Sequence, residues 1–111
     1  MNDCLFCKIA AGLIPSDKVY EDEKTLAFRD IDPKAPTHIL VIPKPHIKSL
    51  AEITDYDIAA HIIRVINQLS VSRGLKEGFR VVVNTGRDGG QTVGHLHFHL
   101  MGGRAMGWPP G

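Results

Sequence analysis

The chain has 111 residues, a formal net charge of +1, 43% hydrophobic residues and 23% charged residues. This length predicts one compact domain over residues 1–111, and the composition is that of a folded soluble protein, not a disordered one. The balanced charge argues against nucleic-acid binding. No apolar run approaches the ~20 residues of a membrane span, and the apolar N-terminal stretch is too short for a signal peptide. We therefore expect a cytoplasmic protein without nucleic acid or membrane as partner.

The first half of the chain contains four patterned segments. They are a short helix and three strands, predicted over residues 4–11, 17–21, 25–30 and 38–42. Gly12 is expected to end the helix, and the segment after it is predicted to be an edge strand. Leu26 and Phe28 share one face of the second strand because side chains alternate. Pro43 and Pro45 are expected to end the third, since proline cannot donate to a ladder.

A long helix and two strong strands are predicted in the second half. The pattern Thr54-x-x-Asp57 resembles a capping box, and the helix should run to about Arg73, before Gly74. One stripe of this helix is apolar and must cover a face of the sheet. It consists of Ile58, Ile62, Val65, Ile66 and Leu69. The strands are predicted over residues 78–84 and 95–100.

The order of these elements predicts the fold class. Strands follow one another through short loops, and no βαβ repeat occurs. Such an order favours an α+β fold with an antiparallel sheet and with the helices on one side of it.

Three histidines alternate with apolar residues near the C-terminus. In a strand, this alternation puts His95, His97 and His99 on one face and the apolar residues on the other. Neighbouring imidazoles would lie ~6.6 Å apart, so one can contact a substrate atom while the next binds an adjacent group. A solvated polar face or a purely metal-binding row is the alternative. Three histidines beside a Gly-rich loop favour a functional site.

The loop before these histidines combines flexible backbone with small polar side chains. Its candidate anion-binding residues are Asn84, Gly86, Arg87, Gly89, Gly90, Gln91 and Thr92. Turns that bind phosphate have this composition, although many Gly-rich loops are only hairpins. The loop leads directly into the histidines and would therefore present a bound anion to them.

The two cysteines, Cys4 and Cys7, have the spacing of a metal half-site or of a redox pair. The redox alternative expects a strand before the motif, in a βαβ unit, and only three residues precede Cys4. Metal is therefore favoured, and a tetrahedral site needs two more ligands. The candidates are His38, His46, His61 and His95.

The segment GHLHFHL resembles the signature of the histidine-triad (HIT) family of nucleotide-binding proteins. The segments FRDIDPKAPTHILVIPKPHI, VVNTGRDGGQTVGHLHFHLMGGR and GWPPG extend the resemblance to the HINT branch, the nucleoside phosphoramidases. It implies a five-stranded antiparallel sheet with one long and one short helix, and a homodimer whose two sheets form one of ten strands. The tail, residues 102–111, would then lie at the edge of the dimer and the active site.

The resemblance also implies cleavage of purine nucleoside 5′-phosphoramidates through a covalent nucleotidyl-histidine, without a catalytic metal. His97 would be the nucleophile, with its other ring N–H held by an acceptor such as a backbone carbonyl. His99 would donate to the phosphate oxygens. His38 would orient a triad imidazole or relay a proton, although a structural role is an alternative.

Ten positions are implied as nucleotide contacts. They are Phe28, Asp30, Ile31, Asn84, Gly90, Gln91, Thr92, His97, His99 and Trp108. Asp30 would bind the ribose hydroxyls, Asn84 and Thr92 the phosphate and leaving group, and Phe28 and Ile31 would pack near the base. Phe28 can equally be core, and Trp108 either reaches the partner's site or caps its own chain.

In relatives that keep both cysteines, a structural Zn²⁺ site is implied at Cys4, Cys7, His46 and His95, with reduced buried cysteines as the alternative. Two other functions stay open. One is hydrolysis of dinucleoside polyphosphates by the same nucleophile. The other is a non-catalytic protein that binds nucleotide or zinc.

Overall fold

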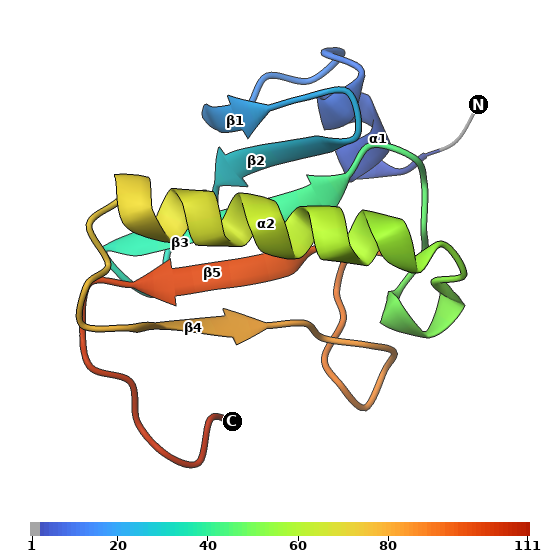
Figure 1. Ribbon diagram of the computed structural model, residues 1–111. Coiled ribbons are helices and arrows are strands. Elements are labelled where there is room, and N and C mark those ends of the chain that lie inside the picture. Colours follow the sequence, from blue (N-terminus) through green and yellow to red (C-terminus); the bar gives the residue numbers. More distant parts are fainter. Residues whose placement is uncertain (1–2) are drawn as a thin grey trace.

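The computed structural model describes residues 3–111 and has one antiparallel sheet with a long helix across one face (Figure 1). The elements are α1 (Leu5–Ala10), β1 (Lys18–Glu21), β2 (Thr25–Arg29), β3 (Thr37–Pro43), a 3₁₀ helix (Leu50–Glu52), α2 (Tyr56–Ser72), β4 (Phe79–Val82) and β5 (Phe98–Gly102). The five strands lie in the order β1-β2-β3-β5-β4, and every neighbouring pair is antiparallel. The predicted α+β class, sheet and edge strand β1 are confirmed.

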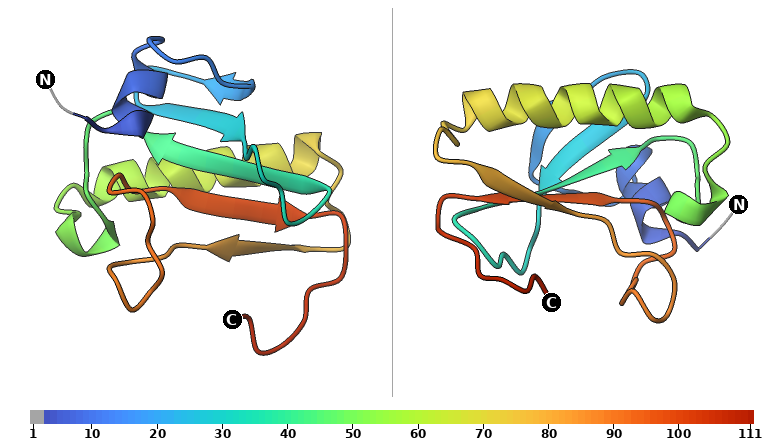
Figure 2. Two further views of the ribbon diagram at one scale, coloured as in Figure 1. Left: turned by 180° about the vertical axis from the view of Figure 1, so that it is seen from behind. Right: turned by 60° about the horizontal axis from the view of Figure 1, so that its bottom comes forward.

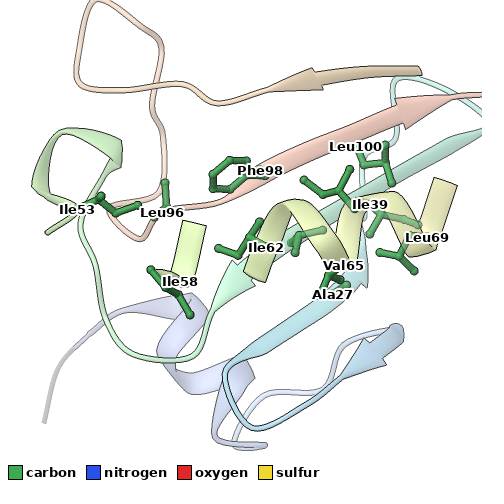
Figure 3. Packing of buried hydrophobic residues seen from close by; sticks show 12 residues of the cluster. Ala27, Ile39, Ile53, Ile58, Ile62, Val65, Leu69, Leu96, Phe98 and Leu100 are labelled. Atoms are coloured by element: carbon green, nitrogen blue, oxygen red, sulfur yellow. The ribbon is translucent and has the colours of Figure 1, made fainter. Parts of the chain in front are cut away.

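The apolar stripe of α2 packs on the sheet as predicted. All five of its residues are buried, and they contact apolar side chains of β2, β3 and β5 (Figure 3). The N-cap, however, is Asp55 and not Thr54, because the Asp55 carboxylate accepts a hydrogen bond from the Asp57 amide at 3.0 Å. Aspartate is at least as good a cap as threonine, and its charge complements the positive end of the helix.

The prediction that both helices lie on one side of the sheet is wrong. Alternate residues of β2 and β3 point to opposite faces, and both sets are buried. Ala27, Ile39 and Val41 pack under α2. Leu26, Phe28, Leu40 and Ile42 pack instead with Phe6 and Ile9 of α1. Because the central strands are apolar on both faces, each face needs a cover, and α1 supplies the second one (Figure 2).

The histidine segment begins its ladder later than predicted. The first pair between β3 and β5 is Val41 with Phe98, so His95 and His97 precede the strand. The Leu96 amide donates instead to the Ile47 carbonyl, at 2.7 Å. The alternation of faces nevertheless holds, because the intervening apolar residues Leu96, Phe98 and Leu100 are all in the core under α2.

Other boundaries differ from the predicted ones by a few residues. The strand β4 ends at Val82, two residues before the predicted end, and β3 includes Pro43. The 3₁₀ helix was not predicted; Ser49 caps it, accepting from the Ala51 amide and hydrogen bonding to Glu52. None of the helices within residues 3–111 combines the length and apolarity needed to cross a bilayer.

Candidate active site

The face of the sheet that carries α1 also carries the histidines. His38 on β3 and His99 on β5 lie beyond the end that α1 covers, at a cavity of about 180 Å³. The cavity is lined by Lys34, His38, Val82, Asn84, His99 and Met101. A larger cavity, about 600 Å³, is lined by residues 74–80 and 103–106 and contains none of the predicted site residues. The smaller cavity is therefore the candidate active site.

His97 lies beside this cavity and has a defined tautomer. It does not line the cavity, its side chain is 6% exposed, and its ring centroid lies 5.0 Å from that of His99. Nδ1 of His97 donates to the His95 carbonyl oxygen at 2.7 Å. The proton is thus on Nδ1, and Nε2 keeps the lone pair that a nucleophile needs. Phe6 packs edge-on against the ring, with the centroids 5.2 Å apart.

His38 and His99 form a hydrogen-bonded pair with a direction. The Lys34 amide donates to Nδ1 of His38 at 3.0 Å, so the proton of neutral His38 is on Nε2. Nε2 lies 2.9 Å from Nδ1 of His99 and donates to it. His99 therefore carries its own proton on Nε2, which is buried and has no hydrogen-bond partner within residues 3–111. A buried donor without a partner is suited to a substrate oxygen.

Both imidazoles of this pair are neutral at physiological pH. Burial, together with the neighbouring His97 and His38, lowers the pKa of His99 to about 4. Burial also lowers the pKa of His38, although the Asp30 carboxylate, 3.4 Å from Nε2, acts in the opposite direction. The relay of donors from Lys34 to His99 consists of neutral groups.

Asp30, His38 and His99 also form a cluster with metal-ligand spacing, since their ligand atoms lie within 4.8 Å of one another. The hydrogen bonds argue against a metal there. A metal on Nε2 of His38 would move the ring proton to Nδ1, which already accepts the Lys34 amide proton. Two donors would then face each other, so this cluster suits proton positioning and not a cation.

Cys4 and Cys7 lie close to two histidines, His46 and His95, away from the cavity at His38 and His99. The Sγ atom of Cys4 lies 3.2 Å from Nδ1 of His95, and Sγ of Cys7 lies 3.3 Å from Nδ1 of His46 and 3.5 Å from Nδ1 of His95. All four ligand atoms lie within 4.8 Å of one another. Nε2 of His95 donates to the Pro43 carbonyl at 2.8 Å, which leaves Nδ1 free to bind a metal.

This cluster fits a tetrahedral zinc ion. With Zn–S and Zn–N bonds of about 2.3 and 2.0 Å, the sulfur-to-nitrogen edge of a tetrahedron is roughly 3.5 Å, close to the observed separations. Of the four candidate histidines, only His46 and His95 are in the cluster. His38 is at the cavity, and His61 donates to the Asp22 carboxylate at 2.7 Å on the α2 side. The predicted quartet therefore forms a candidate zinc site.

The Gly-rich loop is held by its own side chains and backbone. The Gln91 side chain accepts from the Gly86 amide at 3.0 Å and donates to the Lys48 and Val93 carbonyls. These contacts orient the loop and join it to Lys48 outside it, so the Gln91 side chain is engaged by protein groups. Gly89 is required by space, because a Cβ there would lie 2.4 Å from the carbonyl oxygen of Thr85.

The remaining predicted contacts do not gather at the cavity. Phe28 is buried against Phe6 of α1, with the ring centroids 5.5 Å apart, and belongs to the core. Ile31, Gly90, Thr92 and Trp108 are exposed. Their roles as nucleotide contacts stay predictions.

Residues 11–106 match the HIT domain family. The chain belongs to the HIT family. A 14 kDa zinc-binding protein of Zea mays is 50% identical over 111 residues, which cover 96% of this chain and 87% of that protein. The crystal structure of a HIT family hydrolase from Legionella pneumophila has 51% identity and a TM-score of 0.95, with 98% and 100% of the chains covered. A histidine triad nucleotide-binding protein from Candida albicans has 41% identity and a TM-score of 0.84, with 96% and 83% covered.

Several groups that shape the site of this HIT protein were not predicted from its sequence. Two are backbone groups, namely the Lys34 amide and the Pro43 carbonyl, which set the tautomers of His38 and His95. For His97 a backbone carbonyl was predicted as the acceptor, and the structure shows that it belongs to His95. Every residue type supplies a carbonyl and every type except proline an amide N–H, so no sequence signal marks these groups. Phe6 is different, because an aromatic residue between the two cysteines could have been recognised as packing near the histidines.

Proposed function

We propose that this protein is a nucleotide hydrolase of the HINT branch, which cleaves the P–N bond of purine nucleoside 5′-phosphoramidates through a nucleotidyl-His97 intermediate. One observation carries the proposal. Two neighbouring imidazoles have opposite tautomers, so Nε2 of His97 offers a lone pair where Nε2–H of His99 offers a donor. A phosphoryl group needs this combination of nucleophile and donor.

The reaction balances with these groups. Nε2 of His97 attacks phosphorus as the P–N bond breaks, and the leaving nitrogen takes up a proton from solvent and departs as the amine. The imidazole becomes cationic, and the His95 carbonyl, which accepts from Nδ1, stabilises that charge. Water then attacks the phosphorus and gives up one proton to solvent. The electron pair of the P–N bond to His97 returns to Nε2, and the nucleoside monophosphate is released.

His99 and His38 act on the phosphate in this scheme. The unpartnered Nε2–H of His99 donates to a phosphate oxygen, and His38 keeps His99 in the donor tautomer. Asn84, at the same cavity, is suited to the phosphate, and Thr92 and the Gly90–Gln91 backbone to the leaving group and phosphate. Asp30 would bind the ribose, and Phe28, Ile31 and the partner's Trp108 would surround the base.

The zinc site is proposed as structural. Cys4, Cys7, His46 and His95 would hold Zn²⁺ in a closed shell, with no coordination position left for substrate. The bound ion would supply charge and a link between α1 and the segment before β5. The name of the Zea mays relative supports this assignment, and two thiolate ligands suit a reducing compartment such as the cytoplasm.

A homodimer joined at β4 is part of the proposal. The strand β4 pairs only with β5 among residues 3–111 and so ends the sheet. Phe79 and Val81 are 41% and 40% exposed, and Val81 lies opposite Leu100, which faces α2. An apolar edge strand is suited to pair with its copy. Arg80 donates to the Gly107 carbonyl at 2.6 Å, which holds the tail with exposed Trp108 beside that edge.

The decisive experiment traps the intermediate. Wild-type protein turning over an adenosine phosphoramidate is quenched, digested and examined by mass spectrometry, and an adenylyl group on His97 is expected. His97→Ala should show neither adduct nor turnover, whereas the control His61→Ala, on the α2 side, should show both. An adduct on another residue, or turnover by His97→Ala, would contradict the proposed chemistry.

The same assay separates the two other functions. Faster adduct formation with a dinucleoside polyphosphate than with the phosphoramidate would favour that substrate class. Tight binding of nucleoside monophosphate without turnover of either substrate would favour a binding protein.

A further inference from the structure

The loop between β2 and β3 is held at Lys34 from two sides. On one side, the Lys34 amide donates to Nδ1 of His38 at 3.0 Å. On the other, the Lys34 carbonyl accepts two hydrogen bonds from Arg104, from Nε at 3.1 Å and from Nη2 at 2.9 Å. Arg104 follows β5, 70 residues further along the chain. The two backbone groups of one residue thus link an arginine outside the cavity to a histidine within it.

The Arg104 contact is well suited to orienting this loop. A guanidinium is planar and rigid, so two of its donors on one carbonyl define the direction of that carbonyl as well as its position. Nη1 of Arg104 donates in addition to the Ala105 carbonyl at 2.9 Å, which orients the guanidinium itself. The Lys34 side chain is paired with Asp32, at 2.6 Å, and takes no part in the link.

The orientation of Lys34 matters because its amide occupies Nδ1 of His38 and so excludes a proton there. The Asp30 carboxylate, 3.4 Å from Nε2, also favours the proton on Nε2, but without the amide neutral His38 could place its proton on Nδ1 as well. With the proton on Nδ1 of His38, its Nε2 would no longer donate to Nδ1 of His99. No hydrogen bond would then favour the tautomer of His99 that carries its proton on the buried Nε2.

We propose that Arg104 is a positioning residue of this site, which acts through the Lys34 backbone to hold His38 and His99 in the tautomers that present Nε2–H of His99 to a phosphate oxygen. The inference rests on the proposed function for its effect on turnover, but the tautomers themselves are independent of any substrate. Arg104 is exposed and its partners are backbone carbonyls, so its contribution to the free energy of unfolding should be small.

The test compares Arg104→Ala, Arg104→Lys and the control Arg73→Ala. Arg73 is exposed at the end of α2, and its side chain makes no hydrogen bond to the described residues 3–111. For each protein, kcat and KM with an adenosine phosphoramidate, the thermal midpoint, and imidazole proton–nitrogen NMR correlations are measured. These correlations identify the protonated nitrogen of each histidine.

Arg104→Ala should lower kcat about tenfold with KM changed less than about threefold, because a donor to the transition state is lost more than a ground-state contact. Its His38 signals should change from the Nε2–H form to a mixture of tautomers. Arg104→Lys, which keeps one donor, should recover part of kcat and of the Nε2–H signal. Arg73→Ala should resemble wild type in every measurement.

Unchanged His38 and His99 tautomers in Arg104→Ala would overturn the inference, whatever happens to turnover. A loss of kcat that is matched by a large fall in the thermal midpoint, with tautomers unchanged in the folded fraction, would do so as well. If wild type fails to cleave phosphoramidates, the proposed function fails alone, because the NMR comparison of the three variants still decides the role of Arg104.

Discussion

His95 and His97 are joined through the backbone of one and the ring of the other, since Nδ1 of His97 donates to the His95 carbonyl at 2.7 Å. The ring of His95 at the same time faces Cys4 and Cys7, at 3.2 and 3.5 Å from Sγ. A single residue therefore contacts both the candidate zinc site and the candidate nucleophile. Replacing a cysteine should therefore alter the position of the His97 ring through His95.

Replacing one thiolate tests this connection. Cys7→Ser should bind less than one zinc per chain and lose about 2 kcal/mol of stability, which lowers Tm by roughly 10 °C. It should also lower kcat, because His95, whose carbonyl accepts from Nδ1 of His97, loses one of the groups that hold its ring. Metal content by mass spectrometry, thermal unfolding and turnover are measured together. Lys8→Ala on the same helix is the control, and a full zinc complement in Cys7→Ser would refute the assigned ligand set.

Turnover should not require a free divalent cation. The imidazoles and backbone donors supply the electrostatic stabilisation, so activity in excess chelator without Mg²⁺ should match activity with 5 mM Mg²⁺ to within about twofold. Zinc content is followed in parallel, since chelation of the structural ion would act through stability. A strict dependence on Mg²⁺ in protein that retains its zinc would contradict this expectation.

Stability should fall on mild acidification because of His99. Burial holds its pKa at about 4, whereas an unfolded histidine has a pKa near 6.5. Between these pH values His99 is protonated in the unfolded chain but neutral in the folded chain. The free energy of unfolding therefore decreases as the pH falls from about 6.5 towards 4. His99→Asn should show a shallower decrease. Urea unfolding at pH 7, 5.5 and 4.5, at one protein concentration, gives the two slopes, and parallel curves would show that His99 is not the titrating group.

Asp22 should stabilise the fold without affecting catalysis. Its carboxylate accepts from the Tyr20 hydroxyl and His61, each at 2.7 Å, and from both the amide and the hydroxyl of Thr25. Burial raises the pKa of this carboxyl, but the hydrogen bonds from Tyr20 and His61 outweigh it and hold the pKa well below its usual range.

Asp22→Asn replaces one acceptor oxygen by a donor and should cost about 1–2 kcal/mol in urea unfolding at pH 7, with kcat unchanged. Asp17→Asn is the matched control, since that carboxylate is 72% exposed, and should change stability by less than about 0.5 kcal/mol. If the two substitutions lower the free energy of unfolding equally, Asp22 does not have the proposed stabilising role.

A charge on the edge strand should separate the proposed dimer. Val81→Asp places a carboxylate on the exposed face of β4, where pairing with a copy would bury it. Light scattering should give about twice 12.2 kDa for wild type and about 12.2 kDa for the variant. Leu13→Asp, exposed before β1 at the opposite edge of the sheet, should remain dimeric. A wild-type monomer would contradict the proposed assembly directly.

Much of the fold could be predicted because periodicity is a local property. The stripe of α2 and the alternation of β2 and of Leu96, Phe98 and Leu100 all face the core as expected. The incorrect predictions concern features that depend on contacts between segments far apart in the sequence. The β5 ladder begins at Phe98 because its partner residue on β3 is Val41, and the preceding segment turns to bring His95 to the cysteines.

Spacing along the chain already marked two candidate sets of side chains, the three alternating histidines and the pair Cys4 and Cys7. The roles expected of His38, His46 and His95 beside them followed from the resemblance to the HIT family. The tertiary structure alone decided which nitrogen of each ring is a donor. The deciding partners are the backbone of Lys34, Pro43 and His95 and the side chain of Arg104. A tautomer depends on the neighbouring donor or acceptor, and residue types other than proline all have the same backbone groups. Only the folded chain therefore shows which backbone group lies beside each imidazole.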